Sequence, residues 1–113
     1  MNISTRTVDA VTIVDLNGNL KLGEDTEQFR THMRGLLDAG SKKILLNMRN
    51  VHQLDSSGVG ELVRSLATVT SQEGQLKLVN LTKRLHDLLS VTKLLTVFET
   101  FEDERRAINS FAE

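Results

Sequence analysis

The sequence predicts a single α/β domain with a mostly parallel sheet of four to five strands, an opening β-hairpin and about four α-helices. Three observations predict this fold class. Short apolar runs alternate with segments whose apolar residues recur every three or four positions, the pattern of strands joined by crossover helices. The length of 113 residues is that of one domain. The composition, 39% hydrophobic and 26% charged, is typical of a globular chain. We therefore expect residues 1–113 to form one domain.

The chain begins with two segments that predict the hairpin. Residues 3–8 and 11–16 have the composition of strands, and only two residues separate them, so we expect a tight antiparallel connection. Residues 17–19, Asn-Gly-Asn, tolerate positive φ and predict a turn after the second strand.

The first predicted helix follows this turn. Its apolar residues share one helical face because they are three or four positions apart: Phe29, Met33, Leu36 and Leu37. Asp25, with Gln28 three positions later, resembles a capping box. Gly40 suits the end of the helix.

The middle of the chain predicts a buried strand and a second helix. Residues 44–46, Ile-Leu-Leu, form a short apolar run of the kind found in a strand covered on both faces. We expect this strand to end near Met48. The second helix is expected to begin near Val59, where helical spacing of apolar residues resumes, and to end before Gly74.

The last third of the chain continues the alternation. Residues 76–79 predict a strand, and Thr82 could cap a short helix marked by leucines between 85 and 89. Residues 97–98 are a candidate last strand, and residues 107–111 mark a terminal amphipathic helix. In folds of this kind, ligand and partner sites lie beyond the carboxyl ends of the parallel strands.

Charge and composition argue against several classes of function. The formal net charge is −1 and basic residues do not cluster, so we expect no nucleic-acid partner. Without cysteine, disulfides, thiolate catalysis and cysteine-ligated metals are excluded. No apolar run approaches the roughly 20 residues of a membrane span, and the N-terminus lacks a signal-peptide core. We therefore expect a cytoplasmic protein that does not enter a membrane.

Enzyme motifs do not fit the chain. The nucleophile elbow G-x-S-x-G is missing, because Leu54 and Asp55 precede Ser56. Val63 stands where a dinucleotide-binding G-x-G-x-x-G would need its third glycine. The phosphate-binding Gly-Lys-Ser/Thr is also absent, and the three histidines are isolated in sequence. We expect a protein that is not an enzyme and that uses no cofactor and no metal.

Residues 55–60, Asp-Ser-Ser-Gly-Val-Gly, carry the candidate chemistry. One interpretation is that these residues only cap a helix, since Asp and Ser are good N-cap residues. Two features argue for more. Three capping side chains compete for one cap, and two glycines occupy the first turn, where each costs up to about 1 kcal/mol relative to alanine. Small residues there allow a phosphate or another backbone to approach closely.

This hexapeptide, placed after the apolar strand that contains residues 44–48, resembles the signature of the STAS domain. It is most similar to the bacterial anti-sigma-factor antagonists, and the order of strands and helices matches that family over essentially the whole chain. The resemblance implies that Ser56 is the phosphorylated serine. It also implies an unmodified form that binds an anti-sigma factor, itself an ATP-dependent serine kinase, and thereby frees a sigma factor. The resemblance implies as well that a serine phosphatase resets the switch.

The resemblance further implies a partner-binding surface made of this motif and the loop after the second strand: Asp55, Ser56, Ser57, Gly58, Gly60, Asn19 and Lys21. In this surface Asp55 positions the loop, Ser57 and Gly58 line the docking face, and Gly60 permits close approach. Lys21 stands where the family often has an acidic residue, which leaves the identity of the partner open. The oligomeric state is open as well.

Two alternatives remain from the sequence. The chain could be an adaptor subunit of a transporter or signalling assembly in which Ser56 is never modified. It could also bind a nucleotide or lipid at the strand edge, although the motif lacks a phosphate-binding lysine.

Overall fold

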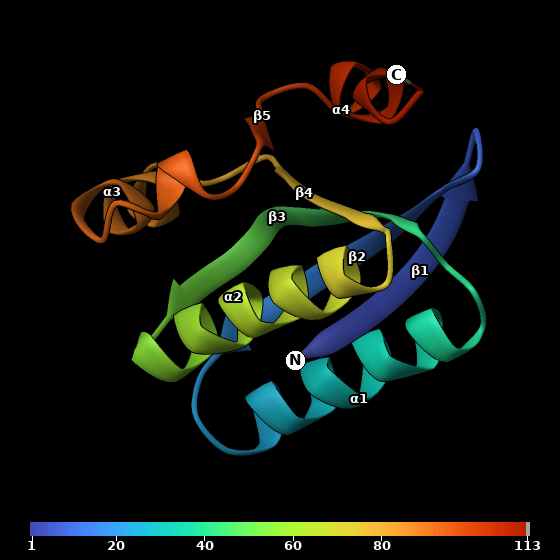
Figure 1. Cartoon of the computed structure of the whole chain (residues 1–113). Helices are drawn as coiled ribbons and strands as arrows, with labels where there is room; N and C mark the ends of the chain where they lie inside the picture. The colour runs from blue at the N-terminus through green and yellow to red at the C-terminus, as the bar shows by residue number, and fades with distance from the viewer. Residues whose placement is uncertain (113) are drawn as a thin grey trace.

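A computed structural model describes residues 1–112 and shows the predicted alternation of strands and helices (Figure 1). The elements are, in chain order, β1 (Asn2–Val8), β2 (Val11–Leu20), α1 (Glu24–Asp38), β3 (Lys43–Leu54), α2 (Ser56–Ser71), β4 (Gln75–Val79), α3 (Lys83–Val91), the 3-10 helix η1 (Leu94–Thr96), β5 (Thr100–Phe101) and α4 (Glu104–Ser110). The strands form one sheet in the order β1-β2-β3-β4-β5. Only the β1–β2 pair is antiparallel among these strands, so the predicted α/β class and its opening hairpin are confirmed.

The sheet is covered on both faces, with α1 and α2 on one side and α4 on the other (Figure 1). The main core includes Phe29 of α1, Leu62 of α2 and Leu46 of β3. A smaller cluster under α4 includes Leu45 and Phe111. Because successive strand residues point to opposite faces, the neighbours Leu45 and Leu46 enter different clusters. This confirms that the central strand is buried on both sides.

The turn predicted at residues 17–19 is wrong, because these residues belong to β2. Gly18 has a φ of +125°, and a Cβ atom built on it would lie 3.3 Å from the Cα of Met1. The pairing of β2 with β3 shifts register between Asp15 and Asn17 and again between Gly18 and Leu20. At each shift β3 contains one more residue than β2. The glycine and asparagines therefore mark an irregular strand rather than its end.

The first helix begins earlier than the capping box at Asp25 predicted. Gly23 is the N-cap of α1, and its backbone N–H donates to Oγ1 of Thr26 at 3.2 Å. The carboxylate of Asp25 instead accepts the backbone N–H of Lys21 at 3.3 Å. The predicted end at Gly40 is confirmed, since its φ is +93°.

The segment around the motif also differs from the prediction. The strand expected to end near Met48 continues to Leu54, and the helix expected near Val59 begins at Ser56. The residues that extend β3 are mostly polar and partly exposed, so apolar patterning did not reveal them. As a result, a single residue, Asp55, separates β3 from α2.

The C-terminal third follows the prediction with one correction. Thr82 caps α3, with Oγ1 accepting the N–H of Leu85 at 3.2 Å. The strand predicted at residues 97–98 is wrong: β5 consists of Thr100–Phe101, whereas Phe98 is buried in the main core outside any strand.

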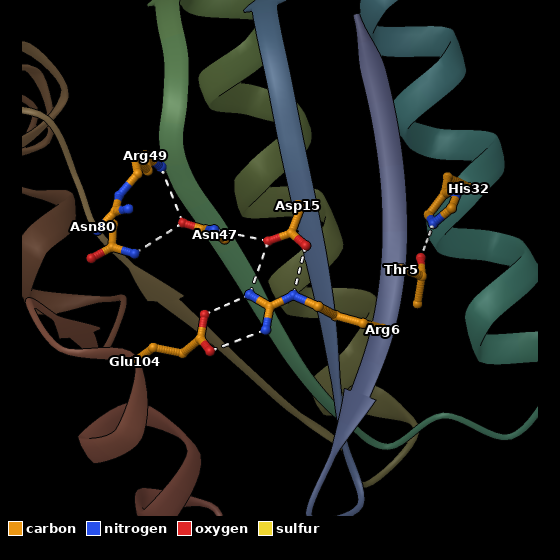
Figure 2. A network of polar contacts seen from close by, with 8 residues as sticks. All are labelled: Thr5, Arg6, Asp15, His32, Asn47, Arg49, Asn80 and Glu104. Atoms are coloured by element: carbon orange, nitrogen blue, oxygen red, sulfur yellow. Dashed lines mark hydrogen bonds and ion pairs between the residues drawn. The ribbon is translucent and has the colours of Figure 1, made fainter.

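A polar network fastens α4 to the hairpin (Figure 2). Arg6 of β1 donates to Asp15 of β2, with an Nε–Oδ2 distance of 2.7 Å, and to Glu104 of α4 at 2.6 Å. Asn47 of β3 extends the network by donating to Asp15 at 2.8 Å. The Arg6 guanidinium lowers the pKa of both carboxyl groups, Asp15 and Glu104.

Within residues 1–112, no helix is both long and apolar enough to cross a membrane.

Candidate functional site

The motif lies at the carboxyl end of the central strands. Leu20, the last residue of β2, pairs with Leu54, the last residue of β3. The two segments that follow these parallel strands therefore start side by side, one at Lys21 and the other at Asp55. This is the edge of the sheet where the fold class places functional sites.

Asp55 connects these two segments. It is the N-cap of α2, and its Oδ1 accepts the backbone N–H of Gly58 at 2.8 Å. Its Oδ2 accepts the backbone N–H of Leu22 at 3.0 Å. The bonds from Leu22 and Gly58 lower the pKa of Asp55, and the charge of Lys21 acts in the same direction. Because Asp55 supplies the cap, neither serine hydroxyl is needed for capping.

The two serines differ in accessibility. Ser56 is the first residue of α2 and is exposed, whereas Ser57 is half-buried. The N-terminus of a helix carries a partial positive charge that favours anions. The more exposed hydroxyl of the pair is thus at the end of the helix where an added negative charge is best tolerated.

The two glycines of the motif have different environments. Gly58 is buried, and a Cβ atom built on it would lie 2.2 Å from the carbonyl oxygen of Leu20 and 2.7 Å from Cδ1 of Leu54. Glycine is therefore required there for α2 to pack against the strand ends, and the place of Gly58 on the docking face stays a prediction. A Cβ atom on Gly60 would have nothing within 4 Å, so Gly60 leaves open space beside the helix.

A pocket of about 310 Å³ opens next to Ser56. It is lined by the start of α2 and by residues of α1 and the loop before it: Leu22, Thr26, Arg30, Ser56, Ser57, Gly60, Glu61 and Arg64. Leu22 stands at this pocket with 77% of its surface exposed.

Sequence reasoning missed a charged cluster in this pocket. The side chain of Glu61 is only 3% exposed and forms ion pairs with both Arg30 and Arg64. Arg30 also binds it through Nε, at 3.2 and 3.3 Å from the two carboxylate oxygens. These contacts, chiefly that of Arg30, lower the pKa of Glu61. One feature of the sequence could have predicted this cluster: Glu61 lies next to Leu62 on the buried face of the helix, and a buried carboxylate needs a cationic or hydrogen-bonding partner.

Lys21 and Asn19 lie on the other side of the motif. Lys21 is exposed and lines a second pocket of about 220 Å³ together with Asp55 and Arg84. Asn19 is half-buried near the end of β2. The structure thus brings the predicted loop residues next to the motif.

The arrangement can present a hydroxyl to a second protein. Ser56 is accessible, and the positions of its neighbours are fixed by the Asp55 contacts. In the part of the chain that the structure describes, no three His, Asp or Glu side chains are grouped so as to hold a metal ion.

Comparison with known proteins identifies the family to which this architecture corresponds. The family model of the STAS domain matches residues 2–107. Among characterised proteins, the anti-sigma-B factor antagonist of Staphylococcus aureus is 29% identical over 96 residues, which is 83% of this chain and 86% of that protein.

Solved structures share the same fold. A candidate anti-sigma factor antagonist from Thermotoga maritima superposes with a TM-score of 0.91 at 25% identity, covering 98% of this chain and 95% of the other. The phosphorylated form of the Bacillus cell-fate determinant SpoIIAA superposes with a TM-score of 0.74 at 21% identity, covering 96% and 98%.

Proposed function

The chain belongs to the STAS domain family, and we propose that it is an anti-sigma factor antagonist that phosphorylation of Ser56 switches off. The antagonist role is supported by the name of its Staphylococcus aureus relative, which matches over most of both chains. The switch is supported by one observation above all. Ser56 is exposed at the start of α2, while Asp55 provides the cap and leaves the serine hydroxyl available.

In its unmodified form, the protein binds an anti-sigma factor through the surface around Ser56. The exposed Leu22 and the open space at Gly60 provide the apolar contact and the room for it. Asn19 and Lys21 border this surface from the end of β2. Gly58 contributes indirectly, by fixing the position of α2 on the strands. Binding would remove the anti-sigma factor from its sigma factor.

The anti-sigma factor is also the serine kinase in this proposal. It transfers the γ-phosphoryl group of ATP to Oγ of Ser56, the hydroxyl loses its proton, and ADP leaves. A serine phosphatase later hydrolyses the phosphate ester with water. The protein itself supplies the acceptor and catalyses neither step.

Phosphorylation acts against the bound partner by changing charge. The phosphate adds about −1.5 to −2 charges at pH 7, next to the carboxylate of Asp55. Burying such a charge in an interface without a matching cation costs several kcal/mol. A cost of about 3 kcal/mol would weaken the complex roughly a hundredfold.

A kinase assay with binding measurements tests the proposal. The protein is incubated with ATP and an anti-sigma factor kinase encoded by the same genome, and the phosphorylated residue is identified by mass spectrometry. We expect Ser56→Ala to abolish labelling and to retain binding, while the matched variant Ser57→Ala is still labelled. Ser56→Asp should weaken binding in calorimetry.

The possible results separate the alternatives. Labelling of Ser57 in the Ser56→Ala protein would show that the wrong serine was chosen. Tight binding of an assembly partner, with no phosphate transferred to either serine, would instead support the unmodified adaptor that the sequence left open.

A further inference from the structure

Ser56, Gly60 and Arg64 form a row along one face of α2, because each is four residues from the next. Side chains of a helix lean toward its N-terminus. Arg64 follows this rule, since its guanidinium reaches back to Glu61. The position between Arg64 and Ser56 is Gly60, which has no side chain and open space beside it. No side chain at position 60 therefore stands between the arginine and the serine along this row.

Arg30 enters the same pocket from α1. It lines the cavity that Ser56 and Arg64 also line, and its side chain is 45% exposed, compared with 63% for Arg64. Each guanidinium has five N–H donors, more than its contacts with Glu61 occupy. Both arginines thus keep donors that face solvent or the pocket.

Glu61 holds the two arginines in place. Its buried carboxylate is shared between them, so two positive charges are balanced by one negative charge. These three side chains together have a net charge of about +1, while Glu27 also acts on Arg30 and the Asp55 carboxylate caps the start of α2. Because Glu61 already restrains both side chains, little conformational entropy remains to be lost when an anion binds.

From this geometry we propose that Arg30 and Arg64 form an internal receptor for the phosphate on Ser56. The inference rests on the proposed phosphorylation of that serine. Guanidinium groups match phosphate oxygens with paired hydrogen bonds, and the 310 Å³ pocket lies between the two arginines and the serine. The phosphate oxygens accept N–H bonds from both arginines while Glu61 keeps them anchored.

This receptor adds a second effect to the switch. The bound phosphate occupies the pocket next to Leu22 and engages the two cations that line it. A partner that used the pocket would lose both the space and the positive charge. Phosphorylation then reshapes the docking surface from within, in addition to placing a negative charge on it.

The test uses protein in which phosphoserine is incorporated at position 56 by genetic encoding, so that no kinase is required. The second pKa of the phosphate, ordinarily about 6, is measured by phosphorus NMR titration. Nearby cations favour the dianion, whereas the Asp55 carboxylate opposes it equally in every variant, so this pKa in the otherwise unmodified sequence should lie about 0.5–1 unit below its value without the arginines. Arg64→Gln and Arg30→Gln should each restore part of the shift.

Two further variants control for charge and for folding. Arg34→Gln removes an arginine one turn further along α1, which lines the neighbouring cleft and not the Ser56 pocket, and should leave the phosphate pKa unchanged. Gly60→Leu keeps every charge but fills the space between Ser56 and Arg64, and should raise the pKa toward that of Arg64→Gln. Each single arginine variant leaves Glu61 with one partner, so folding is preserved.

An identical phosphate pKa in all these proteins would overturn the receptor. The proposed function would be untouched by that result, because it concerns a kinase and a partner that the titration does not contain. Conversely, a failure of the kinase assay to label Ser56 would leave the titration result standing as a property of this pocket.

Discussion

Asp55 joins Leu22 to the start of α2, although the two residues are 33 positions apart in the chain. Its carboxylate accepts the Leu22 N–H at 3.0 Å and the Gly58 N–H at 2.8 Å. The loop after β2 and the first turn of the helix are thus held by one side chain. Ser56, the next residue, is positioned by the same contacts, so the acceptor serine and the exposed Leu22 keep a fixed relation.

Asp55→Ala should loosen both segments. Without the carboxylate, the N–H groups of Leu22 and Gly58 lose their acceptor, so their amide hydrogens should exchange faster and the melting temperature should fall. Asp55→Asn is the matched variant, because its single carbonyl oxygen can still serve as the helix cap. We expect an intermediate effect for it. Equal exchange at Leu22 in all three proteins would contradict the connection.

The contribution of Asp55 should also depend on pH. Its contacts lower the pKa in the folded state, so the stabilisation is present above the ordinary unfolded value of about 3.9. It is lost as the pH falls through the lower folded pKa. The difference in melting temperature between the unchanged protein and Asp55→Asn should therefore be larger at pH 7 than near pH 2. A difference that grows on acidification would contradict this sign.

Gly58→Ala and Gly60→Ala form a matched pair with opposite expectations. The methyl group on Gly58 would overlap the backbone oxygen of Leu20, which cannot move without shifting β2, so we expect a loss of roughly 1–3 kcal/mol or more. The methyl group on Gly60 meets open space and should stabilise the helix by up to about 1 kcal/mol. Urea unfolding measures both free energies. Similar gains in stability in the two variants would mean that helix propensity, and not packing against Leu20, governs this turn.

Arg30→Met should destabilise the protein at neutral pH. Glu61 would keep only Arg64 as its partner, so we expect the free energy of unfolding to fall. Because Arg30 lowers the pKa of Glu61, its effect is present above the ordinary glutamate pKa of about 4.3 and disappears as the pH falls through the lower folded pKa. Urea unfolding at pH 7 and pH 3 checks this.

Arg34→Met is the control for that measurement, since Arg34 is exposed on the same helix. It should change the free energy of unfolding by no more than about 0.5 kcal/mol. An equal loss for Arg30→Met at both pH values would show that the attraction between Arg30 and ionised Glu61 is not what stabilises the protein.

Lys77→Met should release α4 from the sheet. The Nζ atom of Lys77, a side chain in β4, donates to the carbonyl oxygen and the hydroxyl of Ser110 at 3.2 and 2.9 Å, and it lies 4.7 Å from the ring centroid of Phe111. Methionine keeps the volume but removes these contacts, so hydrogen exchange in residues 104–110 should accelerate. The control Lys83→Met changes an exposed lysine. A slower exchange in Lys77→Met would mean that burial of the lysine charge costs more than its contacts return.

The sequence predicted the elements that rest on local patterns. The apolar run at residues 44–46, the cap at Thr82 and the helix end at Gly40 each depend on side chains close in the chain, and each is confirmed. The extension of β3 to Leu54 was missed because its stability comes from pairing with β2, and its polar residues have no strand-like alternation.

The features of the candidate site likewise divide into those set by neighbouring residues in the chain and those set by contacts between distant residues. The motif and the exposure of Ser56 follow from the order of strand, cap and helix, which is local. The pairing of Arg30 with Glu61 joins residues 31 positions apart, and the sequence contains no periodic pattern that predicts it. The packing role of Gly58 could not be predicted for a related reason: only the position of Leu20, fixed by the sheet, shows that the space beside this glycine is already filled.

Because of the two register shifts between β2 and β3, the position of the site depends on the number of residues in each strand as well as on their identity. Along a strand, the side chain of every second residue points to the same face. Deleting one residue therefore moves every later side chain of that strand to the opposite face of the sheet. β3 contains two residues more than β2 across the shifts, and the pair of insertions cancels. A natural variant that lost only one of them could retain all six letters of the motif and still direct its serine toward the wrong side of the sheet.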